Sequence, residues 1–188
     1  MNNNGYIIIG FPGVGKSTVA KGDTRFIDLE SSTFMVDGQR SEDWYKIYVN
    51  VAIDLAKQYN VFISSHMAVQ NYLATLNYNN VIMAYPDKSL KIVWLKRLSK
   101  RCESDPSDKN KRALDYMESN FDTCVDDMDK SNSFMKLRLN SIKQADELHD
   151  LILYVIDKIN TVRREDEVRM KYFGPEKNMI NTDAFLRP

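Results

Sequence analysis

The chain has 188 residues, of which 43% are hydrophobic and 28% charged, a composition typical of one soluble globular domain with its own core. Its 26 basic and 26 acidic residues give a formal net charge of zero, so the chain has no overall field that would draw it onto nucleic acid or a membrane. The two cysteines lack zinc-site spacing, no apolar amino-terminal segment resembles a signal peptide, and no run approaches the ~20 apolar residues that span a bilayer, so we expect a cytoplasmic protein.

The first predicted elements are a strand over residues 6–9 and a short helix around residues 16–21. Between them, residues 10–17 read Gly-Phe-Pro-Gly-Val-Gly-Lys-Ser and match the phosphate-binding pattern G-x-x-x-x-G-K-[ST], a P-loop. Its glycines let the backbone wrap a polyphosphate, Lys16 brings a positive charge to the β- and γ-phosphates, and the Ser17 hydroxyl can ligate magnesium. We therefore predict ATP and Mg²⁺ as cofactors. The predicted nucleotide-binding residues are Gly10, Pro12, Gly13, Val14, Gly15, Lys16, Ser17 and Thr18.

The second predicted strand, residues 25–29, carries acidic residues at its carboxyl end. Asp28 and Glu30 are two positions apart, so they fall on the same strand face. The carboxyl ends of parallel strands form the edge where ligands bind, so these acids are expected beside the P-loop, where an acceptor should lie. Asp28 is the candidate base for an acceptor hydroxyl and a candidate magnesium ligand, directly or through water, and Glu30 can share its task. As an alternative, both are ordinary surface carboxylates.

A helix over residues 41–59, with Ser41 as its N-cap, is predicted to precede a buried strand over residues 61–64. A helix near residues 68–76 and a strand over 81–85 follow. The strand over 61–64 lacks the carboxylate with which switch GTPases and motor ATPases hold magnesium, so magnesium ligation is only partly assigned. For His66, the alternative to a binding role is a purely structural one. The predicted acceptor-binding residues are Asp28, Glu30, Ser31, Ser32, Ser65 and His66.

A segment of uneven charge, residues 88–130, is the predicted lid. Residues 88–112 contain nine Lys or Arg against three acidic residues, and residues 113–130 contain six acidic residues against one base. A basic segment followed by an acidic helix suits a lid that closes over phosphates, excludes water and adds positive charge. Arg97 and Arg101 lie four residues apart on one helical face and are the candidate catalytic arginines. The alternative is that these charges only keep an exposed helix solvated.

The carboxyl-terminal part is predicted to complete the sheet and to add a tail. Residues 134–139 alternate as a fifth strand, and apolar residues over 148–159 recur at the spacing of an amphipathic helix. We predict one P-loop domain over residues 1–160, followed by a C-terminal helix and an extended arm over residues 161–188. The arm can cover its own domain, contact a second subunit or fray, so the expected state is a monomer or a homodimer.

These elements together predict an α/β, three-layer P-loop NTPase fold with a central parallel five-stranded sheet and a helical lid. With its acidic pair after the second strand, the chain over residues 5–160 resembles the small-molecule P-loop kinases, the nucleoside monophosphate kinase and shikimate kinase-like group. Residues 28–32, 61–66, 85–86 and 97–101 are similar, more narrowly, to those of phage-encoded nucleotide kinases. The resemblance implies transfer of the γ-phosphoryl group of ATP to a nucleoside monophosphate or nucleoside, in the host cytoplasm if the protein is viral.

Two other functions remain open at this point. The same chemistry on a hydroxymethylated base within phage DNA is compatible with the basic lid, although the zero net charge argues against it. A non-enzymatic, regulatory nucleotide-binding module, with its tail contacting a partner, is the other. Salt dependence of acceptor binding separates the first alternative from a small-molecule kinase, and acceptor-stimulated ADP release separates the second.

Overall fold

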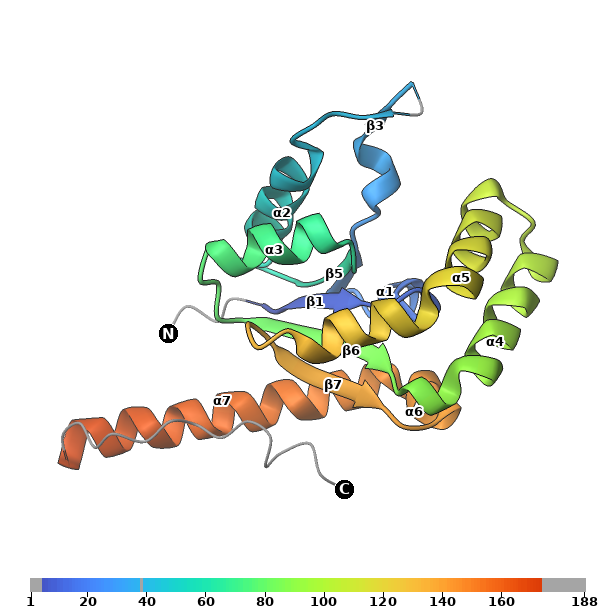
Figure 1. The fold of residues 1–188 in the computed structure, drawn as a ribbon. Helices are drawn as coiled ribbons and strands as arrows, with labels where there is room; N and C mark the ends of the chain where they lie inside the picture. Colours follow the sequence, from blue (N-terminus) through green and yellow to red (C-terminus); the bar gives the residue numbers. More distant parts are fainter. Residues whose placement is uncertain (1–4, 38, 174–188) are drawn as a thin grey trace. The chain divides into compact units, whose positions relative to one another are not determined.

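The computed structural model describes residues 5–37 and 39–173, and its central feature is a five-stranded parallel sheet in the order β2-β5-β1-β6-β7 (Figure 1). This sheet confirms the predicted α/β class. Its strands are β1 (Ile7–Gly10), β2 (Phe26–Asp28), β5 (Asn60–Ser64), β6 (Val81–Pro86) and β7 (Met135–Leu139).

The central strands are continuous apolar runs because both faces of a parallel sheet are covered by helices. The side chains of Ile7, Ile8 and Ile9 in β1 are completely buried, and so are those of residues 61–63 in β5. The strand β1 therefore lies in the middle of the core, with β5 and β6 as its neighbours. The P-loop that follows β1 consequently opens at the centre of the carboxyl edge of the sheet, where ligands bind in such folds.

The helices form layers on both faces of the sheet. Helix α1 leads outward from β1 to the edge strand β2, whereas the connections through α2 and α3 return toward the centre and beyond it. Because such crossovers are right-handed, α1 covers the face opposite to α2 and α3. Helices α2 and α3 pack against each other, as do α4 and α5 (Figure 1). The bounds are α1 (Lys16–Gly22), α2 (Trp44–Leu55), α3 (Met67–Thr75), α4 (Lys91–Ser104), α5 (Asp108–Lys130), α6 (Ile142–Asp146) and α7 (Leu148–Phe173).

The segment before α2 differs from the sequence prediction. It contains a 3-10 turn (Ser31–Phe34) and a two-stranded hairpin of β3 (Met35–Val36) and β4 (Gln39–Arg40), which are too short to give a periodic signal. The prediction that Ser41 is the N-cap was wrong, because Asp43 occupies that position. The Ser41 carbonyl instead accepts a hydrogen bond from the Trp44 amide in the preceding turn.

The chain divides into two compact units after Asp146. The first unit contains the whole sheet and the P-loop. In the second, α7 continues without a break through Asn160, where the sequence predicted the domain boundary, and the predicted extended arm after Phe173 lies outside the described residues. No helix in the described ranges is long and apolar enough to cross a membrane.

Candidate active site

The P-loop has the backbone geometry that its glycines predict. Gly13 and Gly15 have φ angles of 82° and 111°, in the left-handed region that side chains with a Cβ disfavour. A Cβ on Gly10 would lie 2.6 Å from Cδ of Lys16, so a larger residue would displace the lysine. The side chain of Val14 is fully buried. It therefore acts as a packing group beneath the loop and does not line the cavity.

Helix α4 holds the P-loop from outside. The Trp94 indole Nε1 donates a hydrogen bond to the Pro12 carbonyl at 2.8 Å, and Arg97 Nε donates to the Gly13 carbonyl at 3.0 Å. A second guanidinium nitrogen of Arg97 contacts Asp146 Oδ1 at 2.5 Å. Arg97 is thus engaged with the loop backbone and a carboxylate. Its predicted contact with the γ-phosphate stays a prediction.

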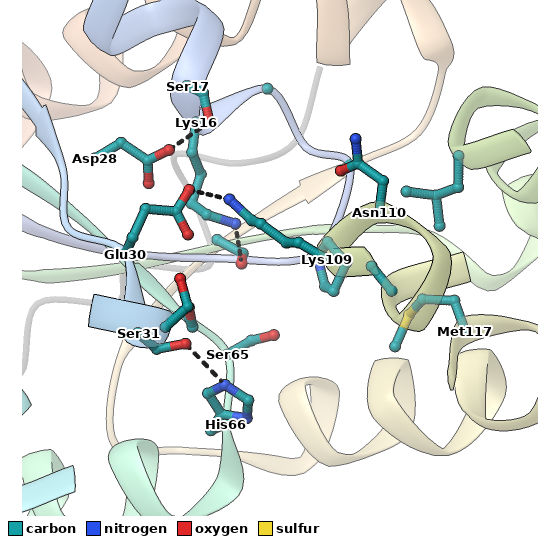
Figure 2. A pocket seen from close by; sticks show the side chains of 18 of the residues that line it. Lys16, Ser17, Asp28, Glu30, Ser31, Ser65, His66, Lys109, Asn110 and Met117 are labelled. Atoms are coloured by element: carbon teal, nitrogen blue, oxygen red, sulfur yellow. Dashed lines mark hydrogen bonds and ion pairs between the residues drawn. The ribbon is translucent and has the colours of Figure 1, made fainter. Parts of the chain in front are cut away.

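A cavity of about 1300 Å³ joins the P-loop to the carboxyl ends of β2 and β5 and to the helices α4 and α5 (Figure 2). Residues far apart in the sequence therefore share one space, and most of the predicted site lines it. The predicted residues in its wall are Gly10, Pro12, Gly13, Gly15, Lys16, Ser17, Thr18, Asp28, Glu30, Ser31, Ser32, Ser65, His66, Arg97 and Arg101.

Ser17 and Asp28 meet at the P-loop end of the cavity (Figure 2). The Ser17 hydroxyl donates a hydrogen bond to Asp28 Oδ2 at 2.5 Å, and Asp28 Oδ1 is buried without a hydrogen-bond partner. A hydroxyl beside a carboxylate with a free oxygen suits a hard cation such as Mg²⁺. The described residues contain no group of three or more His, Cys, Asp or Glu that could cage a metal ion. Phosphate and water oxygens would therefore have to complete the coordination.

Lys16 lies between the loop and the acidic residues. Its Nζ donates a hydrogen bond to the Gly10 carbonyl at 3.0 Å. Burial lowers the pKa of the Lys16 amine, and the negative charges of Asp28 and Glu30 oppose that effect. A polyphosphate bound here would add further negative charge and favour the protonated lysine.

An ion pair crosses the cavity between Glu30, at the end of β2, and Lys109, in the first turn of α5 (Figure 2). Both side chains are partly exposed, so the pair itself contributes little to stability. The ion pair places Lys109, a residue of the predicted lid, against Glu30 of the acidic pair.

A polar cluster lines the part of the cavity next to β5. The Arg40 guanidinium stacks over Trp44 at 4.2 Å and donates a hydrogen bond to Ser31 Oγ at 3.0 Å, which lies 3.2 Å from His66 Nε2. Burial lowers the pKa of His66 to about 4, with the positive charges of Arg40 and Lys16 adding to the effect. His66 is therefore neutral at pH 7, and its Nε2 forms a hydrogen bond with the Ser31 hydroxyl.

Arg40 and Tyr48 were not identified as site residues from the sequence. Arg40 lies on the short hairpin and lines the cavity, as does Arg112, a residue of the predicted lid that lies on α5. Tyr48 lies within the predicted helix over residues 41–59, and its buried hydroxyl donates to the Leu29 carbonyl at 2.7 Å and accepts from the Ser64 amide at 2.8 Å. Tyr48 thereby ties the ends of β2 and β5 together. Helical periodicity along the sequence gives no signal for these hydrogen bonds.

Comparison with known proteins does not assign the chain to a family. No protein-family model matches the chain, and no curated protein matches it. The chain is similar in structure to a gluconokinase from Sinorhizobium meliloti (13% identity, 81% of this chain and 97% of that chain covered, TM-score 0.46). It is also similar to an uncharacterized protein from Eubacterium ventriosum (16% identity, 82% and 99% covered, TM-score 0.44). The central parallel sheet, with a P-loop at the end of β1, defines a three-layer P-loop NTPase fold.

Proposed function

We propose that the protein is an ATP-dependent phosphotransferase that transfers the γ-phosphoryl group to a small acceptor, a nucleoside monophosphate or a nucleoside. The observation that carries this proposal is the single cavity that joins the P-loop to a second set of polar groups at the ends of β2 and β5. A nucleotide-binding module needs only the first part. A phosphotransferase needs both, because donor and acceptor must meet in one space from which water is excluded.

At the donor end, the P-loop would hold the triphosphate, with Lys16 on the β- and γ-phosphates. Ser17 and Asp28 would hold magnesium, which neutralises phosphate charge when bound. Arg101 lines the same cavity, and no carboxylate among the described residues pairs with it. Its guanidinium is therefore available for the charge that develops on the transferred group.

At the acceptor end, Asp28 and Glu30 are the candidate bases where the attacking group is a hydroxyl. Arg40 and Arg112 line this part of the cavity, and neither forms an ion pair with a carboxylate of the described chain. Burial, and then the positive charge of Arg112, lower the pKa of Arg40. Two neighbouring cations that pair with no carboxylate of the described residues favour an acceptor that is itself anionic. This supports a nucleoside monophosphate over a nucleoside.

The test is a panel of acceptors with magnesium and ATP: each nucleoside, each monophosphate and a duplex with hydroxymethylated bases. ADP release and product mass are measured, with Lys16→Ala as the inactive control. We expect acceptor-stimulated ADP release and a phosphorylated monophosphate. If only the duplex is phosphorylated, the acceptor is DNA and not a small molecule. ATP binding without stimulation by any acceptor would contradict the phosphotransferase and leave a nucleotide-binding module.

A further inference from the structure

Three buried side-chain atoms of the described residues have no hydrogen-bond partner: Asp28 Oδ1, Arg40 Nε and Asn110 Oδ1. All three residues line the same cavity. Buried polar atoms in native proteins are nearly always paired, so three exceptions around one space indicate groups that a ligand completes. Asp28 and Arg40 already have roles in the proposed function. Asn110 has none.

The orientation of the Asn110 side chain is fixed. Asn110 is only 4% exposed, in the first turn of α5, and its Nδ2 donates to both the carbonyl oxygen and the carboxylate Oδ2 of Asp105, each at 2.8 Å. A flipped amide would place Oδ1 against two oxygens that can only accept. The nitrogen is therefore committed to the α4–α5 turn. Asn110 Oδ1 remains a pure acceptor at the cavity wall (Figure 2).

The chemistry of the two substrates decides which of them can satisfy this oxygen. The ionised phosphates of the donor at the P-loop present only acceptor oxygens and would repel a carbonyl oxygen. Lys109, the neighbouring cation on α5, is paired with Glu30. The missing partner is then a neutral N–H or O–H group, which neither the phosphates at the P-loop nor Lys109 supplies.

We propose that Asn110 is a specificity-determining residue that accepts a hydrogen bond from an N–H or O–H donor of the acceptor; this inference rests on the proposed function. Ala113 and Met117 follow Asn110 at three and seven positions, on one helical face, and also line the cavity. This face of α5 therefore adds apolar side chains to the cavity wall next to Asn110. This combination fits the edge of a nucleobase, with an amino or imino N–H directed at Asn110.

The test compares the best acceptor of the panel with analogues that each lack one donor: an N-methylated base for the N–H, and a deoxygenated sugar for the O–H. Wild type and Asn110→Leu are measured with every analogue. In wild type, the analogue without the matched donor should lose roughly 10- to 100-fold in kcat/KM, because the buried oxygen is left unpaired. Asn110→Leu should lose a similar factor with the parent acceptor and show no further loss with that analogue.

The matched control is Asn120→Leu, on the same helix but not in the cavity wall, which should discriminate between the acceptors as wild type does. If the loss of kcat/KM from Asn110→Leu and the loss from the analogue simply add, the proposal is overturned. Additivity would mean that water or the protein itself satisfies the Asn110 oxygen. Equal use of all analogues by wild type would overturn it even if the variant fails to fold. If the proposed reaction fails but an acceptor binds, the same comparison is made with dissociation constants. If nothing binds, both proposals fall.

Discussion

The Ser17 hydroxyl donates a hydrogen bond to Asp28 Oδ2 at 2.5 Å, which links the first turn of α1 to the carboxyl end of β2. The contact joins the last residue of the P-loop to the first of the two acidic residues at the predicted acceptor site. It leaves Asp28 Oδ1 unpaired in the same cavity. One carboxylate thus contacts the donor site through one oxygen and presents the other to a cation or to the acceptor.

From this relationship we expect Asp28→Asn to impair catalysis far more than ATP binding. The asparagine carbonyl can still accept the Ser17 hydrogen bond, but the negative charge needed for a base or a cation is lost. The value of kcat should fall about 100-fold or more. The dissociation constant of ATP should remain nearly unchanged. Turnover assays and equilibrium ATP binding measure the two quantities, and equal losses in both would refute the acceptor-side role of Asp28.

Replacing Lys16 by Ala should abolish transfer without unfolding the protein. The variant removes the charge that contacts the β- and γ-phosphates, so we expect a loss of at least about 100-fold in kcat/KM. Because burial opposes the lysine charge in the free protein, the thermal midpoint should stay the same or rise. Lys111→Ala, at an exposed position of α5 outside the cavity wall, is the control and should retain activity. A folded, fully active Lys16→Ala enzyme would remove the P-loop from the mechanism.

Arg40→Met tests the charge of the acceptor. Methionine keeps apolar contact with Trp44 but removes the guanidinium from the cavity. The KM for a monophosphate acceptor should rise roughly tenfold or more, because charged hydrogen bonds are lost. The KM for ATP, and for the corresponding uncharged nucleoside, should change little. Initial rates with each substrate varied in turn give these constants. Parallel losses for the charged and uncharged acceptors would show that Arg40 only supports the local structure.

His66 should make the stability of the protein depend on pH. Its pKa falls from 6.5 to about 4 on folding, so the unfolded chain binds the proton more strongly. The stabilisation is complete above pH 6.5 and is lost progressively as the pH falls toward 4.

We therefore expect His66→Gln to flatten the decline of the free energy of unfolding between pH 6.5 and 4, measured by denaturant titration. Glutamine carries no charge in this range and can still accept the Ser31 hydrogen bond. The control is His149→Gln, because His149 is the other histidine of the chain. An identical pH profile for wild type and His66→Gln would show that the pKa of His66 does not change on folding.

Much of the fold was predictable from local patterns. Apolar runs such as residues 7–9 and 61–63 predicted buried parallel strands, and the structure confirms the five-stranded sheet. Trp94, in the predicted lid segment, is fully buried, and its indole donates to the Pro12 carbonyl. Periodicity predicts which face of an element is buried. It carries no information about a hydrogen bond to a residue 82 positions away.

By itself the sequence determined the phosphate-binding loop, the order of strands and helices, and the acidic pair at Asp28 and Glu30. These depend on residue types at short, fixed spacings. Only the tertiary structure decided that Arg97 faces the loop backbone, that Lys109 reaches Glu30 across the cavity, and that Arg40 and Asn110 leave buried atoms unpaired there. Such relationships depend on how distant elements pack and where each side chain then points, and charge or spacing along the chain does not specify either.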